Sequence, residues 1–302
     1  MPCYSPLTAY KTRSGDVVFS ELRRYGDITQ TLTLPCGQCI GCKLERARQW
    51  GVRCTHEIAM HPQNSFVTLT YSDEHLPRYG TLVYKHFVDF IKRLREHERY
   101  HTGRSGVRFY MGGEYGETTL RPHYHAILFG KDWHDKKPYT RNAQGDTVYI
   151  SRKLEELWGM GQCVTAEANF RTAAYCARYC LSKRTEKEFI HHYQRQLPTG
   201  QIYYVEPEFG HMSLKPGIGA TFVREYTDDI YNFDKVIING KECKPPKYYD
   251  KLLQRHHNWA FEEIKEDREL EGIKHRADNT DERLNVKRIV TEAAIKQLKR
   301  GM

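Results

Sequence analysis

The run Arg121–Gly130 constrains the fold most, because it joins a His-x-His triplet to a long apolar stretch. The residues from His123 to Phe129 have the length and composition of a buried β-strand. Side chains two residues apart project from the same face of a strand, so His123 and His125 would lie side by side, with Cα atoms about 6–7 Å apart. Two such imidazoles can hold a divalent metal ion, although ordinary strand histidines show the same pattern.

The composition narrows the class of protein. Of the 302 residues, 39% are hydrophobic and 28% are charged, which indicates a folded core with solvated extensions. The formal net charge of +9 favours a polyanionic partner. No run approaches the roughly twenty apolar residues of a membrane span, and the first residues lack an apolar signal core. We therefore expect a protein that works in a reducing cytosol.

The cysteines predict a metal site rather than a disulfide framework. Their number, nine, is odd, and no export signal is expected. Cys36, Cys39 and Cys42 form a C-x-x-C-x-x-C knuckle with small residues between them. A structural zinc ion takes four ligands, and Cys3 or Cys54 would supply the fourth. The alternative is a turn with three reduced cysteines; an iron–sulfur cluster is disfavoured because no other feature suggests redox chemistry.

Hydrophobic periodicity predicts alternating strands and helices through the middle of the chain. The predicted strands are 65–71, 107–113, 123–129 and 162–166, and the predicted helices are 43–60, 84–99, 152–158 and 170–182. Beyond residue 182, prolines indicate loops. The stretch 280–300 predicts one more amphipathic helix, whose apolar side would pack on the body of the protein or on a partner.

A stripe of tyrosines follows the last predicted strand. Tyr175, Tyr179 and Lys183 are spaced four residues apart, which places all three on one helix face. Tyrosines at this spacing are commonly packing residues. Here a lysine continues the stripe, and the helix follows the histidine strand.

Glu114 is the third candidate metal ligand. It ends the strand predicted to pair with the histidine strand, and the short link 114–122 predicts an antiparallel hairpin. A carboxylate beside two neutral imidazoles leaves open positions on Mg²⁺ or Mn²⁺ for substrate oxygens. Glu117 is the competing candidate for this ligand. The alternative for both glutamates is that they are solvated acidic residues of a loop and bind no metal.

These motifs together resemble the His-hydrophobe-His (HUH) endonuclease superfamily of rolling-circle replication initiators. The resemblance rests on His123-Tyr124-His125 followed by Tyr175-x-x-x-Tyr179, which is the two-tyrosine form of the pattern. More narrowly, the chain is similar to the replication initiators of the gokushovirus group of microviruses, which are single-stranded DNA bacteriophages. The stretches that carry this similarity are Cys36–Cys42, Phe66–Pro77, Gly113–Gly116, Arg121–Gly130 and, more weakly, Lys244–Asp250.

The resemblance implies site-specific nicking of DNA. Glu114, His123 and His125 would hold Mg²⁺ or Mn²⁺, and the metal would bind a DNA phosphate rather than activate water. A tyrosine would attack that phosphate, giving a 5′-phosphotyrosine and a free 3′-OH.

Two tyrosines would allow the reaction to close a circle. One of Tyr175 and Tyr179 would stay bonded to the old 5′ end while the other cleaves the regenerated origin, and strand transfer would release a unit-length circle. Lys183 would neutralise phosphate charge or assist the leaving oxygen. The family commonly has a lysine where Ser182 stands here, so Lys183 is displaced by one position.

The partners implied are single-stranded and supercoiled viral origin DNA in the cytoplasm of a host bacterium, with no membrane. The chain has no G-x-x-x-x-G-K-[ST] phosphate loop, so we expect a host helicase and DNA polymerase to separate and copy the strands. Arg46, Trp50, Arg53 and Arg121 are candidates to cradle single-stranded DNA by charge and stacking, although arginines on a helix are often simply solvated.

Two other classes of function remain. A non-catalytic zinc-knuckle DNA-binding protein would account for the cysteines and the charge, but not for the histidines and tyrosines. Another metal phosphoesterase would use His123 and His125, with the tyrosines merely packing; if the tyrosine pair were not the nucleophiles, Tyr248 or Tyr249 would be the next candidates.

The fold class expected is α+β, with a central antiparallel sheet of about five strands, the histidine strand in the middle and helices on both faces. Four segments are expected along the chain. They are a Cys-rich N-terminal segment with a basic helix (1–60), an HUH endonuclease core (61–185), a loop-rich extension packed on the core (186–250) and a C-terminal helical tail (251–302).

Overall fold

The chain forms two compact units. The computed structural model describes residues 3–20, 27–103, 106–142, 144–179, 192–197 and 199–297, with the side chains of 178 and 179 outside that description. The smaller unit comprises Met1–Arg46 with Lys265–Arg300, and the larger unit comprises Ala47–Ile264 with the last two residues.

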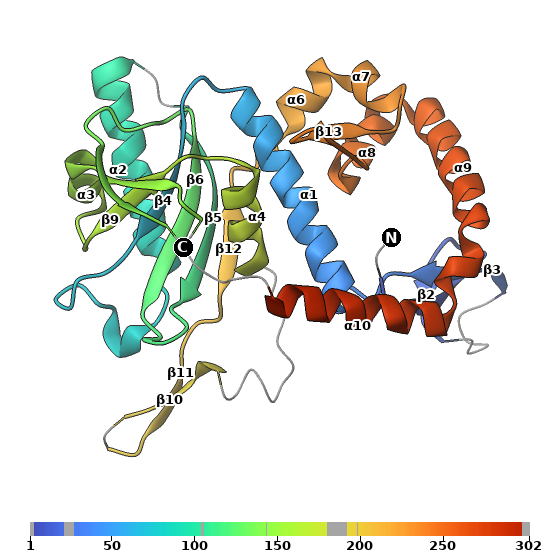
Figure 1. The fold of residues 1–302 in the computed structure, drawn as a ribbon, viewed down its shortest axis with the longest axis horizontal. Helices are drawn as coiled ribbons and strands as arrows, with labels where there is room; N and C mark the ends of the chain where they lie inside the picture. The colour runs from blue at the N-terminus through green and yellow to red at the C-terminus, as the bar shows by residue number, and fades with distance from the viewer. Residues whose placement is uncertain are drawn as a thin grey trace. The chain divides into compact units, whose positions relative to one another are not determined.

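A seven-stranded antiparallel sheet is the centre of the larger unit (Figure 1). Its strands, in spatial order, are β12 (Phe209–Met212), β5 (Arg108–Tyr115), β6 (Pro122–Phe129), β4 (Asn64–Leu69), β9 (Cys163–Ala166), β8 (Thr147–Ile150) and β7 (Lys137–Arg141). The expected antiparallel sheet is present, but it has seven strands rather than about five. The histidine strand β6 is third in the order rather than central.

Helices cover both faces of this sheet (Figure 1). Those nearest the sheet are α1 (Ile40–Ala59), α2 (Tyr84–Thr102), α3 (Arg152–Trp158) and α4 (Phe170–Tyr179). The chain passes from the smaller to the larger unit within α1. The predicted helices 43–60, 84–99 and 152–158 are all confirmed, within three residues at each end.

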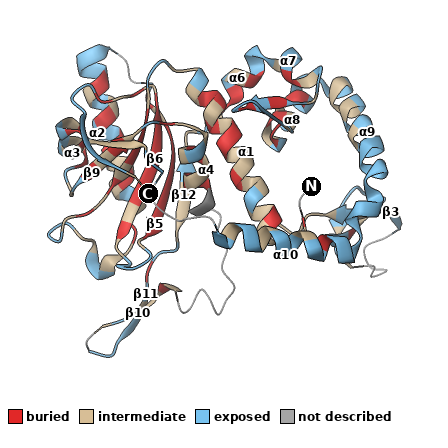
Figure 2. Cartoon of the chain, in the orientation of Figure 1, coloured by how far each residue is buried: buried red, intermediate tan, exposed pale blue. Residues whose placement is uncertain are grey.

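The alternation of β6 divides the core into two layers. Tyr124, Ala126 and Leu128 face α2 and α3, in a cluster that includes Phe87 and Trp158. Ile127 and Phe129 face α4 and the part of α1 that lies in the larger unit, in a cluster with Phe66, Tyr110 and Cys176. Each fully buried large apolar side chain contributes about 1.5–3 kcal/mol to folding. Figure 2 shows buried residues concentrated along the sheet. His123 and His125 belong to the face covered by α4.

Residues beyond 192 are more structured than the prolines indicate. Short elements occupy this region: β10 (Gln194–Gln196), β11 (Ile202–Tyr204), α6 (Ala220–Glu225), α7 (Thr227–Tyr231), β13 (Val236–Ile238), β14 (Lys241–Cys243) and α8 (Lys247–His256). The elements from α6 to α8 surround a third apolar cluster, which includes Val52, Val223, Ile230 and Tyr249, whereas β10 and β11 pair as a separate hairpin. Strands of three residues are too short to show an alternating pattern, so the sequence indicated only the loops that connect these short strands and helices.

The smaller unit has little apolar interior. It contains a three-stranded sheet in the order β2-β1-β3, the end of α9 and the helix α10; the elements are β1 (Leu7–Thr12), β2 (Val17–Val18), β3 (Ile28–Leu34), α9 (Asn258–Lys274) and α10 (Asp281–Gln297). The predicted C-terminal helix is confirmed as α10, but its expected apolar face is open. Leu284 is buried, whereas Val286, Ile289 and Val290 are 49–62% exposed. Leu298 lies outside the described residues.

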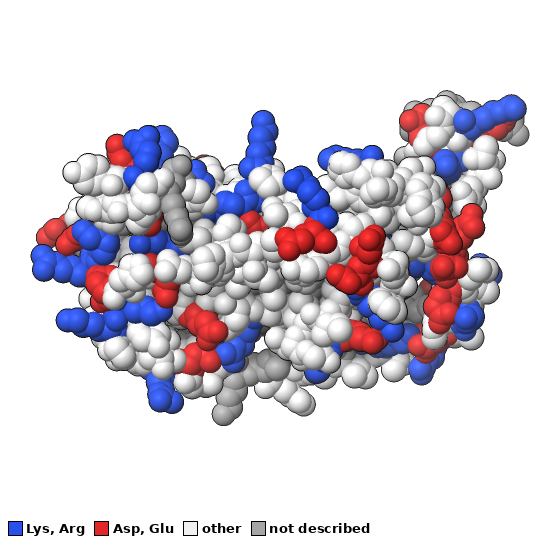
Figure 3. All heavy atoms as spheres, turned by 90° about the horizontal axis from the view of Figure 1, so that it is seen from above, with Lys and Arg blue, Asp and Glu red and all other residues white. Residues whose placement is uncertain are grey.

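Two surface properties bear on possible partners. Across the described residues, every helix is too short or too polar to cross a membrane. Basic and acidic side chains are interspersed on the face shown in Figure 3. Basic side chains are therefore not gathered in one block on that face.

Candidate active site

The β5–β6 hairpin brings Glu114 to the two histidines. The register pairs Glu114 with His123 and Gly112 with His125, so all three side chains project from one face of neighbouring strands. The Glu114 Oε1 atom lies 2.9 Å from His123 Nε2 and 2.6 Å from His125 Nε2. The side chains of Glu114, His123 and His125 are 5%, 18% and 3% exposed, so His123 is the one that meets solvent.

Hydrogen bonds on the far side of each imidazole fix its orientation. His123 Nδ1 lies 3.1 Å from the carbonyl oxygen of Arg121, and His125 Nδ1 lies 2.9 Å from the hydroxyl of Thr68. A carbonyl oxygen can only accept, so His123 Nδ1 carries the proton. A neutral His123 therefore turns the lone pair of Nε2 toward the Glu114 carboxylate. Two lone pairs at this distance repel each other unless a second proton or a metal ion lies between them.

The electrostatics of Glu114 suit a metal ligand. Burial alone would raise the pKa of Glu114. Its hydrogen bonds and charge interactions with His123 and His125 have the larger, opposite effect, so that the pKa is lowered to about 2. Burial lowers the pKa of His125, and the contact with Glu114 only partly offsets this. An anionic carboxylate thus faces an imidazole that favours its neutral form, which is the protonation state that metal coordination requires.

The donor atoms also have the spacing that one ion needs. The ligand atoms of Glu114, His123 and His125 all lie within 4.8 Å of one another. Neighbouring ligands on an octahedral ion with bonds near 2.1 Å are about 3 Å apart. Glu114 Oε2 is buried and has no hydrogen-bond partner among the described residues, so its coordinating capacity is unused. The geometry and chemistry of the three side chains fit a divalent cation.

Tyr175 is the predicted tyrosine that the structure places at this centre. Its hydroxyl donates to Glu114 Oε1 at 3.3 Å, and its ring meets His125 edge to face at a centroid distance of 5.0 Å. Tyr179 ends α4 one helical turn later, and its side chain lies outside the described residues. Lys183 lies outside them altogether.

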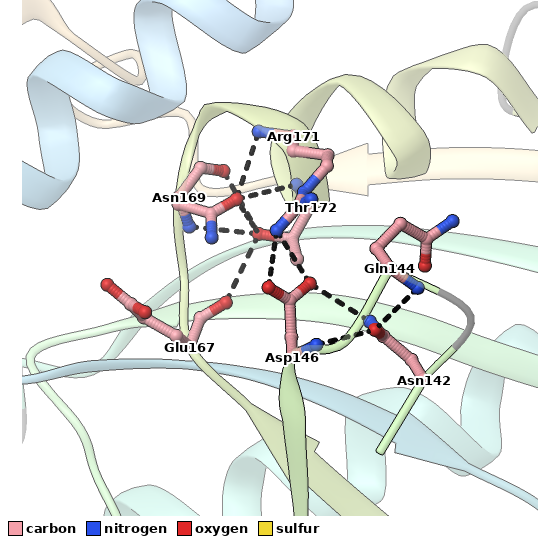
Figure 4. Close-up of polar contacts among 7 residues, drawn as sticks. All are labelled: Asn142, Gln144, Asp146, Glu167, Asn169, Arg171 and Thr172. Carbon is pink, nitrogen blue, oxygen red and sulfur yellow. Dashed lines mark hydrogen bonds and ion pairs between the residues drawn. The ribbon is translucent and has the colours of Figure 1, made fainter. Parts of the chain in front are cut away.

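The start of α4 is anchored by polar contacts, shown in Figure 4. Asn169 Oδ1 accepts hydrogen bonds from the backbone N–H groups of Arg171 and Thr172, which makes Asn169 the N-cap of the helix. The Thr172 hydroxyl accepts in return from the Asn169 N–H. Arg171 also contacts both carboxylate oxygens of Asp146, in the β7–β8 hairpin, at 2.6 Å. These contacts fix the end of the helix that leads to Tyr175.

Some residues that the sequence suggested for DNA binding or as an alternative nucleophile pack against other side chains. Arg53 lies between the rings of Trp50 and Tyr248, 4.0 Å from each centroid, and donates to the Ile218 carbonyl. Tyr249 is fully buried, which raises the pKa of its phenol and removes it from solvent. The expectation that Trp50 and Arg53 are open to bind DNA finds no support in these contacts.

The remaining candidates lie near the surface. Arg121 pairs with Asp73 at 2.7 Å and also donates to the Tyr71 carbonyl, with 39% of its side chain exposed. Arg46 donates to the carbonyl of Gly37. Glu117 is on the exposed turn between β5 and β6, outside the group that includes Glu114.

A second cluster of potential ligands lies in the smaller unit. The sulfur atoms of Cys3, Cys36, Cys39 and Cys42 all lie within 4.8 Å of one another. Cys54, the alternative fourth ligand, is instead buried in the apolar layer beside the large sheet. The structure therefore selects Cys3.

Sequence reasoning missed two residues that contact the candidate metal ligands. Thr68, on β4, holds His125 Nδ1, and Phe66 stacks on the His125 ring at a centroid distance of 5.5 Å. The β4–β6 register places Thr68 directly opposite His125. Thr68 and His125 are 57 residues apart in the sequence. Only knowledge of the strand order could therefore have revealed this pairing.

Comparison with known proteins shows that the segment containing this site matches a known protein family. A family profile described as Replication-associated protein ORF2/G2P matches residues 64–185, the stretch that contains Glu114, both histidines and Tyr175. No solved structure gives a significant match.

The chain is also similar to three curated proteins. It is 32% identical to Replication-associated protein ORF2 of Spiroplasma virus 4, over 89% of this chain and 86% of the relative. It is 29% identical to Replication-associated protein VP4 of Bdellovibrio phage phiMH2K, over 94% of this chain and 89% of the relative. Replication-associated protein ORF4 of Chlamydia phage 1 is 30% identical over 78% of this chain and 57% of its own length.

These similarities define first a class, the viral replication-associated proteins. Within that class, the chain belongs to the family of microvirus replication-associated proteins.

Proposed function

We propose that this protein is the rolling-circle replication initiator of a single-stranded DNA bacteriophage, a metal-dependent endonuclease that nicks the viral origin by tyrosine attack. The observation that carries the proposal is the meeting of Glu114, His123, His125 and the Tyr175 phenol on one face of the sheet. The names of the similar phage proteins support a role in replication.

Glu114, His123 and His125 would bind Mg²⁺ or Mn²⁺, which when bound would polarise the non-bridging oxygens of a DNA phosphate and stabilise the charge of the transition state. Thr68 and the Arg121 carbonyl keep the Nε2 atoms turned toward Glu114. The low pKa of Glu114 keeps this ligand anionic throughout the physiological range.

The phenol of Tyr175 would act as the nucleophile, and its 3.3 Å contact with Glu114 Oε1 supports this role. Its oxygen forms a bond to phosphorus, the bond from phosphorus to the 3′ oxygen breaks, and that oxygen leaves as a hydroxyl after taking up a proton. The phenol loses its own proton to solvent in the same exchange. One phosphodiester replaces another, so the strand can be resealed without ATP.

Tyr179 would repeat the attack on the regenerated origin. Its position one helical turn after Tyr175 suits alternation between two tyrosines at a single metal centre. The 3′-OH released by the second cut would then attack the first phosphotyrosine and close the circle. Lys183 would assist by neutralising phosphate charge.

The cellular setting follows from the same proposal. The DNA partners would be single-stranded and supercoiled viral DNA in the cytoplasm of the host bacterium. A host helicase and DNA polymerase would open and extend the nicked strand. The segment 61–185 would be the endonuclease core, with the segments 1–60, 186–250 and 251–302 added to it.

A supercoiled plasmid that carries the viral origin tests this function. Incubation with the protein and Mn²⁺ should give nicked circles with protein covalently attached at the 5′ end. His123→Ala should abolish nicking, and the double variant Tyr175→Phe with Tyr179→Phe should abolish the adduct. Tyr139→Phe is the matched control, because Tyr139 is exposed on β7, and this variant should keep both activities.

The outcome also separates the alternatives. A non-catalytic DNA-binding protein would shift the DNA without nicking it, and a hydrolytic phosphoesterase would nick it without forming an adduct. A covalent adduct with the double tyrosine variant would overturn the assignment of the nucleophiles.

A further inference from the structure

The described residues of the smaller unit bury few apolar side chains. In its described part, the buried hydrophobic side chains are Cys3, Ala9 and Leu284. Other large apolar side chains of this unit are exposed, among them Phe19 at 64% and Ile273 at 64%. Small units with so little buried apolar area need a disulfide, a metal ion or a partner to be stable.

The four cysteine sulfurs of this unit have the spacing of a tetrahedral metal site. Cys3 Sγ lies 3.7 Å from Cys36 Sγ and 3.9 Å from Cys39 Sγ, and Cys36 Sγ lies 4.0 Å from Cys42 Sγ. A tetrahedron with Zn–S bonds of about 2.3 Å has edges of about 3.8 Å. A disulfide would need sulfurs about 2.05 Å apart, and a four-iron cluster, which lies between its ligands, would hold them farther apart.

The backbone around the cluster is arranged to stabilise thiolates. The N–H of Tyr4 points to Cys39 Sγ, that of Cys36 to Cys3 Sγ and that of Cys39 to Cys36 Sγ, each at 3.3 Å. Cys42 is in the first turn of α1, where the helix dipole favours negative charge. This turn contains no acidic side chain, so the thiolates would supply the anionic charge.

We propose that Cys3, Cys36, Cys39 and Cys42 bind one zinc ion in a closed, structural site, and that this ion supplies the folding free energy that the apolar core of the smaller unit does not. Binding releases the thiol protons to water and leaves no open position for substrate.

The site would join parts of the unit that are distant in sequence. It connects the segment before β1 to the knuckle between β3 and α1. The neighbouring Tyr4 hydroxyl lies 2.8 Å from the Thr291 hydroxyl of α10. Zinc binding would therefore order the sheet β2-β1-β3 and α10 together.

Metal analysis of the full chain tests the proposal. The protein, purified under reducing conditions without chelator and incubated with Zn²⁺, should retain about one ion per chain after gel filtration. Glu114→Ala should retain this ion, which assigns it away from the histidine centre. Cys36→Ser should lose it, whereas Cys243→Ser, which changes a partly buried cysteine outside the cluster, should not.

A second measurement does not depend on the folding of a variant. Removal of zinc from the unmodified chain should increase amide hydrogen exchange in 3–46 and 265–297 and leave the sheet strands β4, β5 and β6 protected. Replacement by Co²⁺ should give the intense sulfur-to-metal absorption of thiolate ligation. Absence of bound zinc, retention of zinc by Cys36→Ser, loss of zinc in Glu114→Ala, or unchanged exchange on chelation would each overturn the proposal.

Discussion

At the scale of single residues, the candidate active site depends on which imidazole nitrogens are free. The Arg121 carbonyl and the Thr68 hydroxyl each engage an Nδ1 atom, so both Nε2 atoms converge on Glu114. Groups that hold the far side of a metal-binding histidine fix its tautomer and ring orientation. The affinity of the site should therefore depend on residues that never contact the metal.

Thr68→Val should weaken Mn²⁺ binding by about 10–100-fold, because the valine keeps the shape of threonine but leaves His125 Nδ1 without its hydroxyl partner. Titration of Mn²⁺, followed by electron paramagnetic resonance, measures the change. Thr70→Val is the control, since the Thr70 hydroxyl contacts the Gln162 carbonyl instead. Equal affinities of Thr68→Val and the unmodified chain would contradict this role.

His56 should make the stability of the larger unit depend on pH. It is buried, stacks on Phe222 and contacts the Tyr249 hydroxyl, and burial lowers its pKa from 6.5 to about 4. The unfolded state therefore binds the proton more readily. The stabilising effect is complete above pH 6.5 and is lost as the pH falls from 6.5 towards 4, by about 2 kcal/mol at pH 5.

Denaturant unfolding at pH 7.5 and pH 5 measures this effect. His56→Gln keeps a polar partner for Tyr249 but does not titrate, so its free energy of unfolding should fall less between the two pH values. The same fall in both proteins would exclude His56 as the source.

At the scale of elements, local patterns predicted what local interactions determine. The strand 123–129, the helix 152–158 and the hairpin that carries Glu114 follow from alternation, helical spacing and a short link, and the structure contains all three. Strand β12 could not be predicted, because its four residues become a strand only by pairing with β5, about 100 residues earlier, as the partners Met111 and His211 show. Contacts between residues distant in sequence also determine the role of Thr68 and the choice between Cys3 and Cys54, so neither could be predicted from local patterns.

The N-cap of α4 provides a test at this scale. Asn169→Ala should lower the free energy of unfolding by about 1 kcal/mol, because two backbone N–H groups at the start of the helix lose their acceptor. Asn169→Asp should restore most of it, since aspartate caps equally well. Thermal unfolding measures both variants. An alanine variant as stable as the unmodified chain would show that Asp146 and Arg171 hold the helix without the cap.

At the scale of the whole molecule, the proposed function assigns separate tasks to the net charge and to the candidate metal centre around Glu114. The net charge of +9 arises from 47 basic and 38 acidic residues, so most basic side chains have an acidic counterpart somewhere in the chain. Figure 3 shows the two signs intermixed on one face. Attraction to DNA should therefore come from many weak phosphate contacts, whereas strand cleavage should depend on the single centre around Glu114.

Binding of single-stranded DNA should accordingly weaken with salt. With about five phosphates contacted, the slope of log K against log salt would be about −3.5, which lowers the affinity about 100-fold between 50 and 200 mM salt. Fluorescence anisotropy with the double variant Tyr175→Phe and Tyr179→Phe, without divalent metal, measures binding in the absence of cleavage. An oligonucleotide with an uncharged methylphosphonate backbone is the control and should bind weakly at every salt concentration. An affinity for natural DNA that is the same at 50 and 200 mM salt would show that the positive charge of the chain does not serve DNA binding.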